Sequence, residues 1–133
     1  MYLLDTNICI YIIKKKPVDV LKTVKTKSKK DIYISSITVA ELEYGVAKSR
    51  FPEKNKIALI GFLSIFTILP FDDADAVEYG IMRAELEKKG KIIGPMDLLL
   101  AAQAKTKRLI IVTNNTREFE RLEGLKIENW VKE

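Results

Sequence analysis

The sequence contains no histidine and only one cysteine, Cys9. Without histidine, RNA cleavage by a pair of imidazoles, histidine-assisted serine or cysteine triads and histidine-ligated zinc are excluded. A single cysteine can form neither an intramolecular disulfide nor a cysteine zinc cluster, which is typical of a protein of the reducing cytoplasm. Cys9 is expected to pack as a small core residue. Any hydrolysis is therefore expected to use carboxylates and a hard cation.

The sequence also lacks an apolar segment long enough to cross a bilayer. Its most apolar stretch, residues 57–71, is interrupted by Gly61, Ser64, Thr67 and Pro70. It therefore falls short of the roughly 20 residues that a membrane-spanning helix needs. The N-terminus has no basic lead of a secretion signal. We expect a soluble cytoplasmic protein with no membrane contact.

What is present fits one folded domain, residues 1–133. Hydrophobic residues make up 47% of the chain and charged residues 31%, a balance typical of globular proteins. The net charge of +5 favours an anionic partner such as nucleic acid, although solubility alone explains it equally well. Lysines crowd residues 14–30, where a solvated helix face is favoured over an RNA track.

Apolar runs of strand length alternate with segments of helical periodicity. Strands are predicted at residues 1–4, 31–35, 67–69, 109–112 and 125–130. Helices are predicted at residues 8–15, from Pro17, at 39–49, from Pro52, at 76–89 with Gly90 as a left-handed cap, from Pro95 and at 117–122. This alternation predicts an α/β fold in which a central parallel sheet of four to five strands is covered by helices on both faces.

Acidic side chains follow or adjoin several of these strand ends. Asp5 ends the first strand, Glu41 lies shortly after the second, and Asp97 lies near the start of the helix that Gly94-Pro95 opens. Sites in such sheets form outside the carboxyl ends of the strands. Several carboxylates there would repel one another, and a bound Mg²⁺ would relieve the repulsion. We therefore predict a metal site formed by Asp5, Glu41 and Asp97.

Each of these acids also has an ordinary structural explanation. Thr38-x-x-Glu41 matches a capping box, in which the glutamate binds the cap amide. Asp97 would be stabilised by the helix dipole, and Asp5 by capping the first helix. The acidic cluster at residues 72–75 precedes a helix, so a structural role is favoured for it. Only the combination of carboxylates points to a metal.

Four segments of the chain match, in order, those of a known family. They are MYLLDTN, SSITVAELEYGV, RAELEKKGKIIGPMDLLLAAQA and IVTNNTREFERLEGLKIENW. Together they span nearly the whole chain, which resembles the PIN-domain ribonucleases and specifically the VapC toxins of toxin–antitoxin pairs. The resemblance implies a PIN-like three-layer α/β/α fold, dependence on Mg²⁺ or Mn²⁺, and cleavage of RNA.

The resemblance also implies roles for individual residues. It assigns the metal carboxylates to Asp5, Glu41 and Asp97, places Thr113 and Asn115 beside the site, and gives Asn7 the role of supporting Asp5. Asp5 and Asp97 are expected to ligate the cation while Glu41 activates the attacking water, so that the products carry a 5′-phosphate and a 3′-hydroxyl.

Position 115 departs from the family pattern. Many members have aspartate where this chain has Asn115, and an amide oxygen can coordinate Mg²⁺ but adds no negative charge to hold a second ion. Glu118 could compensate. The sequence therefore leaves open whether one metal or two operate, and any second ion is expected to be recruited by RNA phosphate.

The resemblance implies partners as well. They are a structured RNA substrate such as transfer or ribosomal RNA, a VapB-type antitoxin whose C-terminal segment occupies the cleft, operator DNA reached only through that antitoxin, and a second copy of the chain in a homodimer. Two other functions remain open. One is a non-catalytic PIN-like module that binds RNA or protein, and the other is a receiver-type signalling domain in which clustered acids bind Mg²⁺ beside a phosphoacceptor aspartate.

Overall fold

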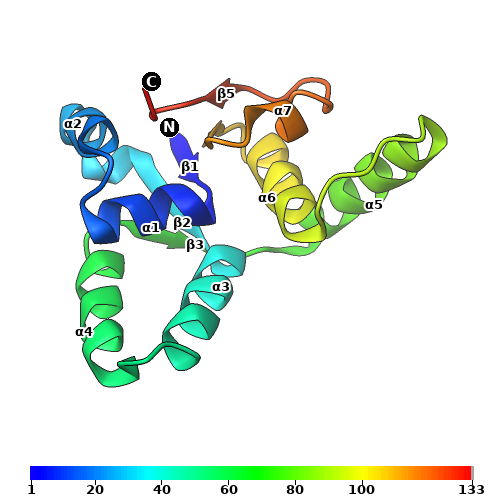
Figure 1. The fold of residues 1–133 in the computed structure, drawn as a ribbon. Helices are drawn as coiled ribbons and strands as arrows, with labels where there is room; N and C mark the ends of the chain where they lie inside the picture. The colour runs from blue at the N-terminus through cyan, green and yellow to red at the C-terminus, as the bar shows by residue number, and fades with distance from the viewer. Residues whose placement is uncertain (133) are drawn as a thin grey trace.

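The computed structural model describes residues 1–132, and its centre is one parallel sheet (Figure 1). The strands lie in the order β3-β2-β1-β4-β5. Their bounds are β1 Tyr2–Leu4, β2 Ile32–Ser35, β3 Thr67–Leu69, β4 Ile110–Val112 and β5 Ile127–Glu128. In register, Tyr2 of the central strand faces Ile32 on one side and Ile110 on the other. The predicted parallel sheet of four to five strands is confirmed.

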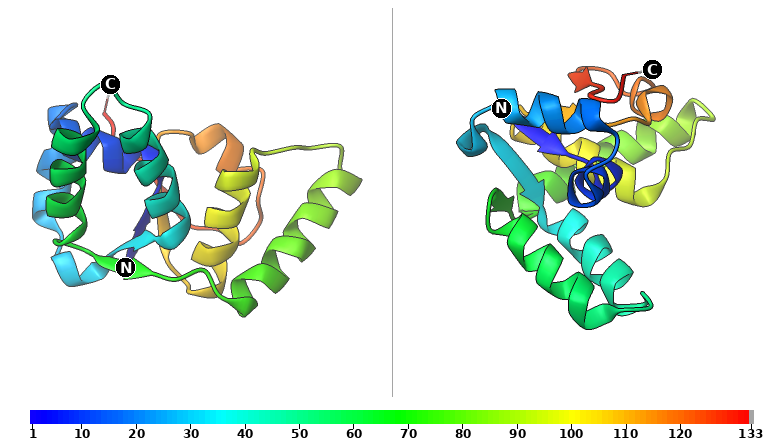
Figure 2. Two further views of the ribbon diagram at one scale, coloured as in Figure 1. Left: turned by 90° about the horizontal axis from the view of Figure 1, so that it is seen from below. Right: turned by 60° about the vertical axis from the view of Figure 1, so that its left-hand side comes forward.

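Helices cover both faces of the sheet (Figure 2). Those that pack on one face are α1 Thr6–Lys14, α2 Val18–Thr26, α3 Ser36–Ala47 and α4 Pro52–Leu63. Those on the other face are α5 Asp73–Lys88, α6 Pro95–Thr106 and α7 Thr116–Phe119. Successive side chains of a strand point to opposite faces, so Leu3 joins the α5–α7 core and Leu4 the α1–α4 core. The three-layer α/β/α architecture is confirmed, and Cys9 is fully buried as expected.

The order of the strands excludes one of the functions that the sequence left open. In a receiver-type domain the strand order is 2-1-3-4-5, so β1 lies between β2 and β3. Here β1 lies between β2 and β4, and β3 pairs with β2 at the edge of the sheet. The receiver-type interpretation is therefore wrong.

Within residues 1–132 no helix is both long and apolar enough to span a membrane.

Several element boundaries differ from the predicted ones. Helix α3 begins at Ser36, not at residue 39, because the Ser35 hydroxyl accepts the Ile37 amide at 3.1 Å and caps the helix there. The capping box predicted from Thr38 and Glu41 is therefore wrong. Helix α7 ends three residues earlier than predicted, and β5 contains only residues 127–128. Gly90 has the expected positive φ, 68°, just beyond the end of α5.

The acidic cluster before α5 has a structural role, as the sequence suggested. Asp72 caps the helix by accepting the Asp75 amide at 3.1 Å, and Asp75 accepts the Asp72 amide at 2.9 Å in return. The fully buried Asp75 carboxylate also accepts the Thr106 hydroxyl and lies 3.2 Å from Lys107 Nζ. It therefore fastens the start of α5 to the end of α6.

We expect Asp75→Ala to lower the free energy of unfolding by about 2 to 3 kcal/mol. The substitution removes a helix cap and leaves buried partners of the carboxylate unsatisfied. Asp73→Ala is the matched control, because Asp73 is exposed in the same turn, and it should change stability by less than about 0.5 kcal/mol. Urea unfolding measures both, and equal midpoints for the two variants would contradict the fastening role.

Candidate active site

Asp5 lies where the central strand ends and α1 begins. Its amide donates to the Val112 carbonyl of β4 at 3.0 Å, which fixes the residue beside the neighbouring strand. One carboxylate oxygen, Oδ1, accepts the Ile8 amide at 2.9 Å and caps α1. The other, Oδ2, accepts the Thr113 hydroxyl at 2.5 Å. Asp5 is thus a helix cap and also a buried carboxylate at the carboxyl end of the sheet.

Glu41 projects from the second turn of α3 towards the same place. Its Oε1 accepts the Thr6 hydroxyl at 2.6 Å, across 35 residues of sequence. Burial raises the pKa of Asp5 above its ordinary value of 3.8, and the negative charge of Glu41 raises it further. The two carboxylates therefore interact. Sequence reasoning missed Thr6, although its position beside Asp5 at the start of a helix was a usable signal.

Asp97 lies in the first turn of α6, which the Gly94-Pro95 turn directs to this edge of the sheet. Its Oδ2 accepts the side-chain amide of Asn115 at 3.3 Å. Burial raises the pKa of Asp97 to about 6, followed by repulsion from Glu118 and then from Asp5. A helix N-terminus favours the ionised carboxylate, so burial and like charges here outweigh it.

Asn115 and Glu118 hold the entry to α6 in place. The Asn115 side-chain amide donates to Glu118 Oε2 as well as to Asp97. Glu118 Oε1 accepts the Gly94 amide at 2.8 Å, and this bond is the main reason why the pKa of Glu118 lies below its usual value. Thr113 completes the network, because its hydroxyl accepts the Asn115 backbone amide at 2.9 Å.

Asn7 contributes less than the resemblance implied. It is exposed, and its side chain makes no hydrogen bond within residues 1–132. Its backbone amide lies near the Asp5 carboxylate and lowers the pKa of Asp5. Support of Asp5 by the Asn7 side chain stays a prediction.

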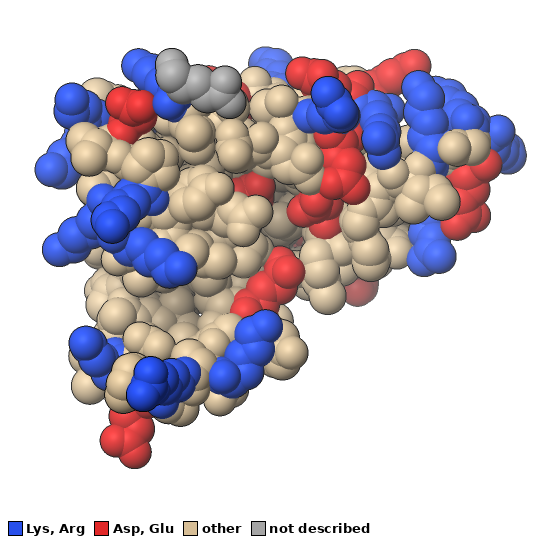
Figure 3. Space-filling model, in the orientation of Figure 1, with Lys and Arg blue, Asp and Glu red and all other residues tan. Residues whose placement is uncertain are grey.

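Four carboxylates thus form a row along this edge in which neighbours repel one another: Glu41 and Asp5, Asp5 and Asp97, and Asp97 and Glu118. Acidic side chains are visible around a hollow in the middle of one face of the molecule (Figure 3). Among the described residues, no three acidic or cysteine side chains stand close enough to enclose a metal ion by themselves. Oxygen donors that repel one another nevertheless fit a hard divalent cation, because such an ion offsets their charge and completes its coordination with water.

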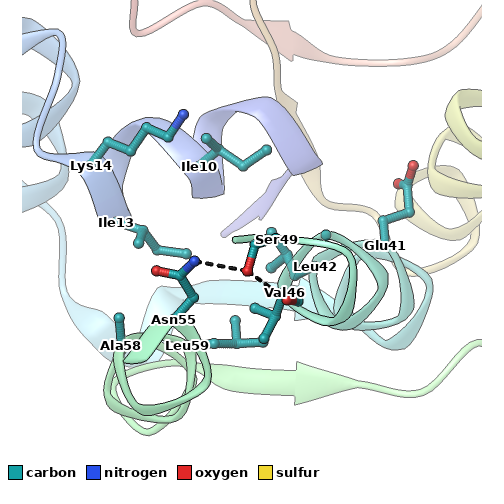
Figure 4. Close-up of a pocket in the computed structure, with 11 residues that line it drawn as sticks. Ile10, Ile13, Lys14, Glu41, Leu42, Val46, Ser49, Asn55, Ala58 and Leu59 are labelled. Atoms are coloured by element: carbon teal, nitrogen blue, oxygen red, sulfur yellow. Dashed lines mark hydrogen bonds between the residues drawn. The ribbon is translucent and has the colours of Figure 1, made fainter. Parts of the chain in front are cut away.

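A groove of about 370 Å³ opens beside this edge, between α1, α3 and α4. Apolar side chains dominate its lining, among them Ile10, Ile13, Leu42, Val46 and Leu59. Figure 4 shows Glu41 at one end of the groove and a polar pair, Asn55 and Ser49, linked by a 2.9 Å hydrogen bond within it. The groove therefore leads directly to one of the candidate site carboxylates.

Comparison with known proteins agrees with this fold. A family profile described as PIN domain matches residues 2–125. The chain therefore belongs to the PIN domain family. Within it, the chain is 48% identical to "Ribonuclease VapC2" of Haemophilus influenzae, covering 98% of both chains, and 47% identical to "tRNA(fMet)-specific endonuclease VapC" of Shigella flexneri, covering 97% of both. It is also similar to the crystal structure of VapBC2 from Rickettsia felis bound to a promoter DNA fragment, with a TM-score of 0.92, 45% identity and 98% coverage of both chains.

The pKa of Asp97 predicts how stability depends on pH without added metal. Its pKa is about 6 in the folded protein and 3.8 ordinarily, so folding favours the protonated form. The stabilisation is complete below about pH 4 and is lost as the pH rises through 6. Asp97→Asn removes this loss. We expect the melting temperature of Asp97→Asn minus that of wild type, both measured in EDTA, to increase from pH 4 to pH 7. A difference that stays constant over this range would contradict the shifted pKa.

Proposed function

We propose that this protein is a divalent-metal-dependent endoribonuclease that acts as the toxin of a VapBC-type toxin–antitoxin pair. The observation that supports it most is the series of repelling carboxylates at the carboxyl end of the sheet, which a cation would stabilise. PIN-domain nucleases are in general dependent on divalent metals. We propose Mg²⁺ or Mn²⁺ here, because the donors are hard carboxylate and amide oxygens.

The side chains divide the work in the proposed mechanism. Asp5 and Asp97 hold the cation, which when bound offsets the charge that develops on the phosphoryl oxygens. Thr6 donates to Glu41 Oε1 and so orients this carboxylate, while Oε2 makes no hydrogen bond within residues 1–132. We propose that this free oxygen accepts a proton from the attacking water. In-line attack then leaves a 5′-phosphate and a 3′-hydroxyl.

Asn115 bears on the number of cations. Its side-chain amide donates to two carboxylates, Asp97 and Glu118, and so stabilises them without a second ion. Both oxygens of Glu118 accept hydrogen bonds, one of them from the Gly94 backbone. We therefore propose one resident cation, with any further ion brought by the phosphate of the RNA.

The proposed substrate is a structured RNA, with transfer RNA as the first candidate. The support is the name of a 47% identical relative, a tRNA(fMet)-specific endonuclease. A second candidate function is a PIN-like module that binds RNA or protein without cutting it. Asn115 favours this alternative, since it provides no charge where many members have aspartate.

We expect Asp5→Asn, Glu41→Gln and Asp97→Asn each to lower the rate of RNA cleavage at least about a hundredfold while the fold is retained, because each removes a charge from the site. Glu43→Gln is the matched control on α3, since Glu43 pairs with Lys56 on the surface, and it should cleave normally. Gel assays of transfer RNA cleavage with Mg²⁺, Mn²⁺ or EDTA measure the effects. Full activity in EDTA would exclude the metal, and no cleavage by wild type would favour the non-catalytic module.

The proposed protein partner is a VapB-type antitoxin. Solved relatives include VapBC complexes, among them one from Rickettsia felis bound to a promoter DNA fragment and one from Salmonella typhimurium bound to DNA. We propose that an antitoxin segment fills the groove between α1, α3 and α4, since the groove is apolar and ends at Glu41. Operator DNA would be reached only through the antitoxin. The homodimer is also a proposal, for which exposed isoleucines on α4, Ile57 and Ile60, offer apolar surface.

Gly45→Leu should weaken antitoxin binding at least about tenfold with little change in RNA cleavage. Gly45 lines the groove, and a Cβ added there meets no atom within 4 Å, so the new side chain occupies the groove without disturbing α3. Gly80→Leu on α5 is the matched control, because its Cβ is equally free and lies outside the groove. Calorimetric titration with a VapB-type antitoxin measures binding, and equal affinity of the two variants would place the antitoxin elsewhere.

A further inference from the structure

The accessible surface of α3 and of Lys48, its C-cap residue, shows a pattern that the catalytic roles do not explain. Glu41, Tyr44 and Lys48 are separated by three and four residues, so they follow one another along the helix surface. With a rise of 1.5 Å per residue, Tyr44 lies about 4.5 Å and Lys48 about 10.5 Å beyond Glu41 along the helix axis. A strip of surface therefore leads from the candidate active site to an aromatic ring and then to a cation.

Glu41 lies on the border between two faces of α3. Each residue turns the helix by about 100°, so Leu42 and Val46 fall on one side of Glu41, and both line the apolar groove. Tyr44 and Lys48 fall on the other side and do not line it. The aromatic strip is thus separate from the surface proposed for the antitoxin.

Tyr44 is unusually accessible for an aromatic residue. It is 65% exposed, so core packing does not account for it, and its hydroxyl makes no hydrogen bond within the part of the chain described. Lys48 Nζ lies 4.7 Å from the centre of the ring. Such an exposed cation–π contact is weak, which leaves both the ring and the ammonium group available to a ligand.

The hairpin formed by α3 and α4 presents a second pair of the same kind. At its turn Arg50 lies 5.5 Å from the ring of Phe51, which is 58% exposed. The hairpin projects away from the sheet (Figures 1 and 2). Lys and Arg side chains gather on its end in the space-filling view, while acidic side chains surround the hollow above it (Figure 3).

We propose that Tyr44 and Lys48 form a subsite for an unpaired RNA nucleotide next to the scissile bond, with the base stacked on the Tyr44 ring and a phosphate bound by Lys48. The proposal rests on the proposed nuclease function. Every base has a face that can stack on an aromatic ring, so the subsite accepts any of the four bases but requires that the base be unpaired. It therefore favours an RNA loop over a duplex.

Charge and position favour RNA over a protein at this surface. A phosphate needs the cation that Lys48 supplies, whereas the apolar contacts of a peptide segment are already provided by the groove on the opposite side of Glu41. The chain has a net charge of +5, which attracts a polyanion to the protein as a whole. Tyr44 lies only about 4.5 Å beyond Glu41 along the helix axis, so a nucleotide next to the one being cleaved would reach its ring.

The test measures binding without cleavage, in the inactive Glu41→Gln background with Mg²⁺. The probe is a fluorescein-labelled single-stranded RNA, followed by anisotropy. Tyr44→Ala should raise Kd about tenfold, because stacking of one base contributes on that order. Tyr44→Phe, which keeps the ring, should bind within about twofold of the parent. Tyr44→Leu keeps apolar bulk without an aromatic face and should behave as Ala.

Lys48→Ala gives an independent signature. Loss of one phosphate contact should lower the slope of log Kd against log salt by about 0.7, whereas Tyr44→Ala should leave that slope unchanged. Lys88→Ala, an exposed lysine on α5, is the charge control and should leave both affinity and slope unchanged. In the active protein, Tyr44→Ala should raise KM with little change in kcat, because the contact binds substrate and transition state alike.

Several results would overturn the subsite. These are an unchanged Kd for Tyr44→Ala, an equal loss for Tyr44→Phe, or full binding by Tyr44→Leu. A change of molar mass in light scattering with unaltered RNA affinity would assign the surface to a second copy of the chain instead. If wild type fails to cleave any RNA while the variants shift Kd as expected, the nuclease proposal falls, and the subsite is overturned as part of an active site and remains only as a surface that binds single-stranded RNA. If wild type cleaves RNA normally but Tyr44→Ala leaves Kd unchanged, the subsite is wrong and the nuclease proposal stands.

Discussion

The arrangement of the site depends on one buried carboxylate, that of Asp5 at the end of the central strand. Its backbone is bound to β4, one of its oxygens starts α1, and the other holds Thr113. Burial makes the ionised form costly, which the raised pKa expresses. Three hydrogen-bonding groups only partly compensate, so the carboxylate is fixed in position and still short of positive charge. The proposed cation site at this point therefore rests on where the topology of the sheet places this carboxylate.

Features set by local pattern were accessible from the sequence. Strands and helices alternate with distinct periodicities, so the layers and the parallel sheet could be predicted. The start of α3 could not be predicted from the sequence, because Ser35 and Thr38 are both good capping residues. Only the structure shows that Ser35 is the one that caps the helix. Glu41 looked like half of a capping box, but its partner is Thr6, 35 residues away. A hydrogen bond between distant segments leaves no periodic signal in one sequence.

The position of Asp97 shows the same limit. Gly94-Pro95 predicted that Asp97 lies in the first turn of a helix. The start of that helix, however, is held by a hydrogen bond from the Gly94 amide to Glu118, 24 residues after Gly94. The sequence also suggested Asn115 as a weak replacement for an acid. In the structure its amide bridges two carboxylates, a use that requires a donor and that aspartate could not serve. A departure from the family pattern is thus integrated into the network.

Glu41 joins the two proposed binding surfaces. The groove lies on one side of it and the exposed Tyr44 on the other, because the two faces of α3 diverge from this residue. A segment that only filled the groove would leave the aromatic strip accessible, so binding there could not by itself exclude an RNA strand. Inhibition would instead have to act at the carboxylate, by displacing the cation or occupying Glu41 Oε2. An antitoxin segment in the groove would therefore have to reach Glu41 itself in order to block cleavage, because filling the apolar part of the groove leaves the other side of this residue open.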